Sequence, residues 1–269
     1  MLKNVDSIGL VDTHCHIIPN IDDGSSSLDE SLQMARVAVA SGVSTIVATP
    51  HHGVRNIENR ADLVDLKVQS LNAELMSRNI PLTILSGQEV RVRPWLIEEL
   101  YEGTIRTLNS TRYILLELPS YGVPDYFQHV LHELSILQMT PVIAHPERNY
   151  EFLRNPSSLI PFIDQGALCQ VTSQSIMGLF GYKVQKLAIE LCKNNWVHLI
   201  ASDAHNMSSR PGMLKQGYQR LEKKIGKQRV QMYKANAVKL IENEFIGLAI
   251  PLRKRKKNFF QSLYSFKQT

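Results

Sequence analysis

The chain has 269 residues, of which 43% are hydrophobic, and this length and apolar content suit one large α/β barrel or two ordinary domains. Its formal net charge is +5. No stretch approaches the roughly 18 uninterrupted apolar residues needed to cross a bilayer, and the first ten residues lack the apolar core of an export signal. Three cysteines without a CxxC pair exclude a disulfide framework, so we expect a cytoplasmic protein in a reducing compartment.

Short apolar runs alternate with helical patterns along the chain, and seven of these runs end at or near an acid, a histidine or a hydroxyl. In chain order the predicted elements are a strand at Val11–His16, a helix between Ser27 and Gly42, a strand at Ile46–His51, a helix at Ala61–Met76, a strand at Ile84–Glu89, a helix at Pro94–Tyr101, a strand at Ile114–Glu117, a helix at Tyr126–Gln138, a strand at Val142–His145, a helix at Pro156–Gln165, a strand at Leu168–Thr172, a helix at Tyr182–Asn194, a strand at Leu199–His205 and a helical region at Gly212–Ile241. This alternation favours a parallel sheet covered by helices. Seven strands with candidate ligands at most of their ends favour a closed or distorted barrel, because the strand ends of a barrel meet at one rim.

The first predicted helix carries clear boundary signals. Ser27 and Glu30 fit a capping box, in which Ser27 accepts hydrogen bonds from first-turn amides and Glu30 returns to the Ser27 backbone N–H. Gly42 fits the residue after the helix, where a left-handed backbone is common.

Histidines and carboxylates at six of the strand ends predict a metal site. His14 and His16 are two residues apart on an extended strand, so both imidazoles point to the same side. Glu89 and Glu117 directly follow apolar runs with few basic residues, and burying them without a cation would be costly. The other candidates are His51, His145, Asp203 and His205. This set of nitrogen and oxygen donors suits manganese, iron, zinc or magnesium, and it is large enough for two or three ions.

Several segments resemble one known family in their order and spacing. They are Asp12–Pro19, Ile21–Gly24, Glu30–Ser31, Ala48–His51, Gly87–Glu89, Leu116–Glu117, Pro141–Arg148, Ala201–Asn206 and Ser209–Pro211. Together they resemble the bacterial manganese-dependent protein tyrosine phosphatases of the polymerase-and-histidinol-phosphatase (PHP) superfamily. The resemblance extends over about residues 9–245.

The resemblance implies a distorted TIM-like (β/α)7 barrel, the PHP fold, as a single domain with a metal site at its carboxyl rim. It also implies that Glu89 bridges metal ions, and it alone adds Asp23 to the ligands. Arg148 and Arg210 match residues that hold the substrate phosphate, a role that suits the fixed fork of a guanidinium group. The implied metal ligands are His14, His16, Asp23, His51, Glu89, Glu117, His145, Asp203 and His205.

The implied activity is hydrolysis of phosphotyrosine by a metal-dependent protein tyrosine phosphatase, with a metal-bridging hydroxide attacking phosphorus. The expected cofactor is Mn²⁺, as two or three ions, with iron, zinc, cobalt and magnesium as alternatives. The implied partner is a tyrosine-phosphorylated protein, a bacterial tyrosine kinase that controls capsular or exopolysaccharide synthesis, and no nucleic acid is expected. The general acid stays open between His51 and His205.

Other classes of protein share parts of this pattern. Histidinol-phosphatase-like enzymes and other metal-dependent phosphoesterases, including polymerase-associated nuclease domains, share the ligands and are the main alternative. Amidohydrolases also begin with His-x-His, but they typically place a lysine on a middle strand, where this chain has Glu117. A barrel that binds without catalysis would lack some ligands, whereas the matched set is complete.

Catalysis by a cysteine thiolate is not expected. Cysteine-dependent tyrosine phosphatases use a Cys-x5-Arg loop, which requires an arginine six residues after the cysteine. The residues six positions after Cys15, Cys169 and Cys192 are Ile21, Ser175 and His198.

Three positions stay open between a functional and a structural role. Asp12 either orients a ligand histidine or caps its loop. His52 either lines the pocket or lies on a solvated loop. Thr172, at the one strand end without a metal ligand, either contacts substrate or only closes the barrel.

A basic and aromatic segment follows the predicted barrel domain of residues 1–250. Residues 251–269 contain five consecutive basic residues, Arg253–Lys257, and then Phe259, Phe260, Tyr264 and Phe266. Such a tail can contact an anionic membrane at about 1 kcal/mol per basic residue, dock on a partner or stay solvated. We therefore expect a cytoplasmic protein that the tail can bring to the inner face of the membrane.

Overall fold

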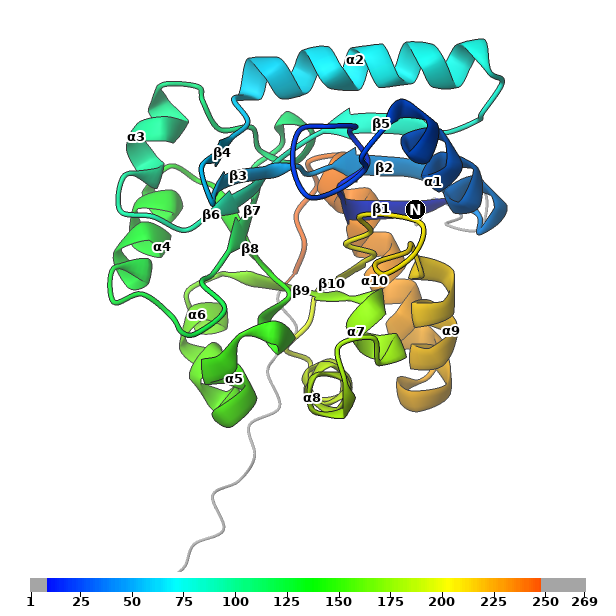
Figure 1. Ribbon diagram of the computed structural model, residues 1–269. Coiled ribbons are helices and arrows are strands. Elements are labelled where there is room, and N and C mark those ends of the chain that lie inside the picture. Colours follow the sequence, from blue (N-terminus) through cyan, green and yellow to red (C-terminus); the bar gives the residue numbers. More distant parts are fainter. Residues whose placement is uncertain (1–8, 248–269) are drawn as a thin grey trace, which may run out of the picture.

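The strands form a ring that is divided between two sheets (Figure 1). The computed structural model describes residues 9–247, so the predicted tail of residues 251–269 lies outside the described residues. The strands are β1 (Leu10–Cys15), β2 (Val43–Ala48), β3 (His51–Val54), β4 (Ile57–Glu58), β5 (Thr83–Ser86), β6 (Glu89–Arg91), β7 (Tyr113–Glu117), β8 (Thr140–Ala144), β9 (Leu168–Thr172) and β10 (Leu199–Ala201). One sheet has the order β1-β2-β5 and the other the order β10-β9-β8-β7-β6-β3-β4. Every pair is parallel except the hairpin of β3 and β4.

Two of the predicted strands pass from one sheet to the other, which makes the ring irregular. The second predicted strand is divided into β2 and β3 at residues 49–50, and the third into β5 and β6 at residues 87–88. Pro50 has no N–H to give to a ladder. A Cβ at Gly87 would lie only 2.8 Å from Val47 Cγ1, so this break is packed too tightly for another residue.

The first and last strands complete the ring. Cys15 and Ala204 form a parallel bridge, and the His16 N–H donates to the Ala204 carbonyl over 2.8 Å. If β2 is counted with β3 and β5 with β6, the ring has seven parallel positions. The predicted fold class, a distorted (β/α)7 barrel, is confirmed.

Helices cover the outside of the ring and follow the predicted alternation (Figure 1). They are α1 (Leu28–Ala40), α2 (Ala61–Ser77), α3 (Leu96–Tyr101), α4 (Phe127–Ile136), α5 (Tyr150–Arg154), α6 (Ile160–Asp164), α7 (Ser173–Met177), α8 (Tyr182–Lys193), α9 (Leu214–Ile225) and α10 (Lys227–Ile241), with 3₁₀ turns at Leu108–Ser110, Pro146–Arg148 and Pro156–Leu159. The short helices α5 and α7 were not predicted, since five residues give too little periodicity. Gly226, with φ 88°, divides the last predicted helical region into α9 and α10. Within residues 9–247 no helix combines the length and apolar character needed to cross a membrane.

The start of α1 agrees with the prediction except in one hydrogen bond. Ser27 Oγ accepts from the Glu30 N–H over 3.2 Å, and Gly42 follows the helix with φ 87°. The Glu30 carboxylate, however, accepts from the Ser26 N–H over 2.9 Å and from the Ser26 hydroxyl over 2.8 Å. The predicted bond to the Ser27 N–H is therefore wrong, because Ser26 offers this carboxylate two donors.

Apolar side chains inside the ring close its amino-terminal end. Leu115, Val142 and Leu168 belong to one buried cluster with Leu240 of α10 and with Ile246. In Figure 1, α10 is seen through the ring of strands. Because this end is filled, the carboxyl ends of the strands are left open for a site, as in other α/β barrels.

A buried histidine just before β10 makes folding stability sensitive to pH. His198 is 1% exposed, its Nδ1 accepts the Cys169 N–H over 3.1 Å, and burial lowers its pKa from 6.5 to about 4. Between these values the unfolded chain binds a proton that the folded chain does not. Acidification from about pH 7 to about pH 4 should therefore remove about 3 kcal/mol of stability through this residue.

We expect His198→Asn to remove this part of the acid destabilisation while keeping an acceptor near the Cys169 N–H. Urea unfolding of chelator-treated wild type and variant, at neutral and at acid pH, measures the difference. His129 provides the control because its side chain is 72% exposed, so His129→Asn should keep the wild-type pH dependence. An unchanged pH dependence in His198→Asn would contradict the prediction.

Candidate metal centre

The predicted metal ligands lie together at the open end of the ring. They come from β1 (His14), the loop after it (His16, Asp23), the starts of β3 (His51) and β6 (Glu89), the end of β7 (Glu117), and the segments after β8 (His145) and β10 (Asp203, His205). All are buried except Glu117, which is partly exposed, and Asp23, whose side chain is 51% exposed. The structure therefore brings together every residue of this predicted set.

The innermost group consists of His14, His16, Glu89 and Asp203. His14 Nε2 lies 3.2 Å from His16 Nε2, 3.3 Å from Glu89 Oε2 and 3.3 Å from Asp203 Oδ1. His16 Nε2 lies 3.2 Å from the same Glu89 oxygen and 3.4 Å from the same Asp203 oxygen. Two nitrogens and two carboxylate oxygens thus converge closely enough to share one cation.

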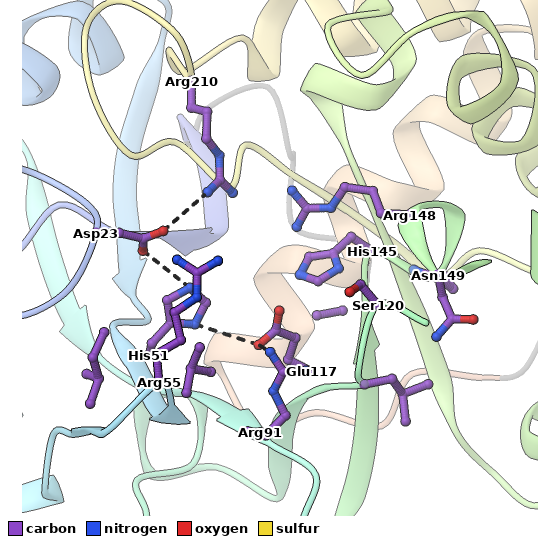
Figure 2. A pocket seen from close by; sticks show the side chains of 15 residues that line it. Asp23, His51, Arg55, Arg91, Glu117, Ser120, His145, Arg148, Asn149 and Arg210 are labelled. Carbon is purple, nitrogen blue, oxygen red and sulfur yellow. Dashed lines mark ion pairs between the residues drawn. The ribbon is translucent and has the colours of Figure 1, made fainter. Parts of the chain in front are cut away.

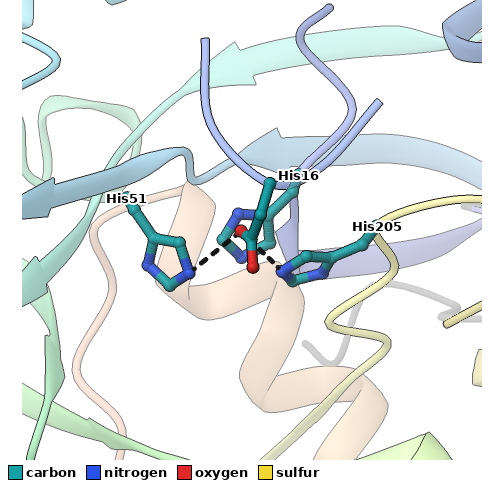
Figure 3. A group of neighbouring side chains, drawn as sticks. His16, His51 and His205 are labelled. Atoms are coloured by element: carbon teal, nitrogen blue, oxygen red, sulfur yellow. Dashed lines mark ion pairs between the residues drawn. The ribbon is translucent and has the colours of Figure 1, made fainter. Parts of the chain in front are cut away.

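A second group lies beside the first, around Asp23 (Figure 3). Asp23 Oδ1 is 3.4 Å from His51 Nε2 and 3.4 Å from His205 Nε2. In Figure 3 the dashed ion pairs of these two histidines meet at this carboxylate, next to the ring of His16. The ring centroids of His16 and His205 are 3.8 Å apart, so His16 links the two groups.

Glu89 contacts members of more than one group. Besides its contacts with His14 and His16, its Oε2 lies 3.1 Å from His51 Nδ1, and its Oε1 lies 2.6 Å from His145 Nε2. His51 Nδ1 is also 3.8 Å from Glu117 Oε2, which makes a third group of donors. A carboxylate in this central position has the geometry to bridge two cations.

Several donor atoms of the cluster are buried without a hydrogen-bond partner. Among the described residues these include His51 Nδ1, Glu89 Oε2, Asp203 Oδ1 and His205 Nε2. An unsatisfied buried polar atom costs about 1–3 kcal/mol, so such a concentration calls for a common partner. Imidazole nitrogen and carboxylate oxygen without thiolate are the donors that manganese, iron and zinc accept. The residues present therefore fit a cluster of divalent metal ions.

Burial and local charge set the protonation of these side chains. Burial lowers the pKa of His145 to about 4 and that of His205 to about 4, so both rings are neutral near neutral pH. Burial, and next the charge of Glu89, raise the pKa of Glu117 to about 7. Burial opposes ionisation of Glu89, but the surrounding histidines hold its pKa well below the usual range. For His16 and His51, burial is outweighed by neighbouring carboxylates, which raise the pKa of each ring. A metal ion would displace these protons, because neutral imidazoles and ionised carboxylates are the forms that bind metals.

Two residues that were not predicted from the sequence orient His14 and His16. The His14 ring donates from Nδ1 to Gln170 Oε1 over 2.8 Å, and the His16 ring donates from Nδ1 to Asp22 Oδ2 over 2.7 Å. These bonds turn both Nε2 atoms toward the cluster, as partners of metal-binding histidines do. The available signal for Gln170 was an amide inside an otherwise apolar strand.

Backbone strain accompanies two of the predicted ligands. His145 has φ 33° and Asp203 has φ 55°, a left-handed conformation that costs about 1–3 kcal/mol for residues other than glycine. Each follows the end of its strand, so the turn directs the side chain back over the rim. Such strain persists where the surrounding structure holds it, which is common at functional sites.

A cavity of about 300 Å³ opens onto the cluster, and four arginines line it (Figure 2). Arg148 and Arg210 each donate from Nη2 to Asp203 Oδ2 over 2.7 Å. Arg91 lies on the other side, with its Nη2 2.9 Å from Glu117 Oε2. Arg148 and Arg210 were predicted from the sequence, whereas the other two arginines, Arg55 and Arg91, were not.

The three positions left open by the sequence have structural contacts. Asp12 Oδ1 accepts the Ser202 N–H over 2.8 Å, which fixes the end of β10. His52 lies near two further carboxylates, but Arg93 binds it over 2.9 Å and neutralises them, so this group needs no metal. Thr172 accepts from the Ser175 N–H and thereby caps α7.

The cysteines are buried and outside the reach of substrate. Burial raises the pKa of Cys192 to about 12, and it raises that of Cys15 and of Cys169 above the usual range. A buried neutral thiol is a poor nucleophile. These environments give no support to thiolate catalysis.

Comparison with known proteins gives matches over most of the chain. The family described as capsular polysaccharide synthesis, CpsB/CapC, matches residues 10–242. The tyrosine-protein phosphatase YwqE of Bacillus subtilis (strain 168) is 38% identical over 251 residues, covering 93% of this chain and 99% of the relative. The putative tyrosine-protein phosphatase CapC of Staphylococcus aureus is 36% identical over 252 residues, covering 93% and 99%.

A solved structure agrees with these matches. It comes from work on YwqE of Bacillus subtilis and CpsB of Streptococcus pneumoniae, described as metal-dependent tyrosine phosphatases. It covers 91% of this chain and 100% of its own chain, with 38% identity and a TM-score of 0.89. The likeness therefore includes the whole barrel and the strand ends that carry the cluster.

Proposed function

The chain belongs to the CpsB/CapC family of capsular polysaccharide synthesis, and on this premise we propose that it is a metal-dependent protein tyrosine phosphatase. One observation carries the proposal beyond family membership. Glu89 lies among histidines and carboxylates, several of whose buried donor atoms have no hydrogen-bond partner within residues 9–247, and Arg148 and Arg210 line the same cavity. A polynuclear metal site beside two guanidinium groups is suited to hydrolysis of a phosphate ester.

The proposed metal ligands are those of the cluster: His14, His16, Asp23, His51, Glu89, Glu117, His145, Asp203 and His205. When bound, two or three divalent ions would supply positive charge and lower the pKa of a water so that hydroxide is available near neutral pH. We propose Mn²⁺ as the native metal, because the donor set combines nitrogen with several carboxylate oxygens and has no thiolate. The buried donor atoms that lack a hydrogen-bond partner in the described part of the chain support a bound cation at this cluster.

Arg148 and Arg210 would bind the phosphate of the substrate. Both guanidinium groups reach the edge of the cluster, where each now pairs with Asp203. The fork of each guanidinium group can bind two phosphate oxygens and stabilise the negative charge as it spreads in the transition state. A phenolic leaving group, with a pKa near 10, needs less help from an acid than an alkyl alcohol does.

The proposed substrate is a phosphotyrosine-containing protein, namely a bacterial tyrosine kinase that controls capsular or exopolysaccharide synthesis. Apolar side chains of Val54, Ile57 and Leu118 line the cavity and support an aromatic ester as the bound group. We further propose a barrel domain of residues 1–250 in the cytoplasm, with the basic segment Arg253–Lys257 contacting anionic lipid at the inner face of the membrane.

Hydrolysis of a tyrosine-phosphorylated peptide by chelator-stripped protein tests the function. Activity should disappear on chelation and return most fully with manganese, compared with zinc, cobalt, iron and magnesium. Activity that is indifferent to chelation would count against the metal site. Hydrolysis of histidinol phosphate without hydrolysis of the peptide would instead identify a small-molecule phosphatase.

A further inference from the structure

The hairpin of β3 and β4 carries an arginine at its tip. Arg55 and Asn56 form the turn with φ 47° and φ 70°, the two positive values of a type I′ turn. Asn-Gly or Asp-Gly is usual in such turns, because an ordinary side chain at positive φ is strained. An exposed arginine at the first turn position is therefore a costly choice, and residues held in this way cluster at functional sites.

The stem of the hairpin is fixed, so its tip has a defined place. Arg93 donates from Nη1 to Glu58 Oε1 over 2.9 Å and from Nη2 to Glu58 Oε2 over 3.0 Å. It also binds Glu99 at the start of α3 and thereby ties β4 to the body of the barrel. Gly53 has φ 82°, and a Cβ there would lie 3.1 Å from Arg93 Cζ, so the stem packs closely on this arginine.

Arg55 differs from the other arginines of the cavity in having no anionic partner. Arg148 and Arg210 pair with Asp203, and Arg91 pairs with Glu117. Over residues 9–247, the guanidinium of Arg55 has neither an ion pair nor a hydrogen bond. In Figure 2 it is drawn on the side of His51 and Arg91, across the cavity from Arg148.

The residues that flank the hairpin tip face the same cavity. Val54 and Ile57, on either side of the turn, line it together with Leu118, whereas Arg55 itself is exposed at the mouth. These apolar side chains offer a packing surface to an aromatic ring that enters the cavity. The peptide on either side of the ring then lies at the mouth, within reach of Arg55.

We propose that Arg55 is a specificity-determining residue that binds an anionic group next to the phosphotyrosine of the substrate. This inference rests on the proposed function. The anionic group is an acidic side chain or a second phosphate, because a guanidinium fork recognises both carboxylate and phosphate oxygens. The guanidinium of Arg55 would then make the cavity prefer phosphotyrosine peptides that carry such an anionic group.

Kinetics with matched peptides test the proposal on the full-length, metal-loaded protein. One phosphotyrosine peptide has glutamates beside the phosphotyrosine, a second has glutamines there, and a third has a second phosphotyrosine. For wild type, kcat/KM should be about fivefold higher for an anionic peptide than for the glutamine peptide, mainly through KM. In Arg55→Asn this ratio should fall to about one, and asparagine suits the turn, so folding should be kept.

Binding and a neighbouring arginine provide the controls. The dissociation constant of a phosphonate analogue of the preferred peptide should rise about fivefold in Arg55→Asn, as fluorescence anisotropy measures without turnover. Arg60 is five residues away, its side chain is 59% exposed and it does not line the cavity. Arg60→Asn removes the same charge and should keep the wild-type ratio and activity.

The outcomes separate the role of Arg55 from the proposed phosphatase function. If Arg55→Asn loses the preference for the glutamate peptide over the glutamine peptide, the anion is a carboxylate. If it loses only the preference for the doubly phosphorylated peptide, the anion is a phosphate. Ratios in Arg55→Asn that equal those of wild type for both peptides would overturn the role of Arg55 alone. If wild type hydrolyses none of the phosphotyrosine peptides, the proposed function itself fails.

Discussion

Replacing Glu89 by glutamine is expected to remove metal from the cluster and to lower kcat by at least about 10³-fold. Glu89 is 1% exposed, and its two oxygens lie near His14, His16, His51 and His145. An amide keeps the size of the side chain, but it loses the negative charge and one oxygen. The change therefore affects more than one donor group, whereas loss of a peripheral ligand would affect one.

The measurement is metal content by mass spectrometry together with kcat, after equal loading with manganese. Glu147 gives a matched control, since it is also a fully buried glutamate with one oxygen that lacks a hydrogen-bond partner in the described structure. It bonds Thr172 instead of the cluster, so Glu147→Gln should keep the wild-type metal content. Full metal occupancy and activity in Glu89→Gln would refute the bridging role. Thermal unfolding of both variants would show whether the fold is retained.

The predicted ligands differ in how clearly the sequence marks them. Glu89, Glu117 and His145 come at or just after the ends of apolar runs, so composition and the geometry of parallel strands suffice to bring them to one rim. Asp23 lies in the loop after β1, where Asp-Asp-Gly is typical of any turn. Local pattern could not distinguish it from Asp22, and only the family resemblance did so.

The orienting residues were missed because their contacts join distant parts of the chain. Gln170 binds His14 across 156 positions of sequence, a pairing that no local pattern contains. The hairpin of β3 and β4 was missed for a different reason. Its turn uses Arg55 and Asn56 in place of the usual Asn-Gly, so the cavity wall that it forms had no recognisable signal.

The irregular form of the ring was also beyond the sequence analysis. Pro50 and Gly87 stand inside runs that were predicted as single strands, and both interrupt pairing at the point where the chain changes sheets. Proline and glycine in a strand commonly mark an edge, a bulge or a close approach. These residues do not predict that the strand continues in another sheet, because that depends on which neighbouring strands it pairs with.

Replacing Arg148 or Arg210 by lysine is expected to lower kcat by about 10²-fold each while leaving metal content unchanged. Lysine keeps the positive charge but lacks the planar fork that holds two phosphate oxygens. Arg154 on α5 provides a control, since its guanidinium lies 5.7 Å from the centre of the Tyr150 ring and does not line the cavity. Arg154→Lys should keep wild-type kinetics.

The variant that combines Arg148→Lys and Arg210→Lys shows whether the two side chains act together, because both donate to the same oxygen of Asp203 over 2.7 Å each. Groups that share one partner are not independent, so the combined loss should be about 10³-fold and not the product of the single losses. A loss equal to that product would mean that the two side chains act separately on substrate. Loss of metal in either single variant would instead make the arginines supports of Asp203, and the phosphate would then need another binding group.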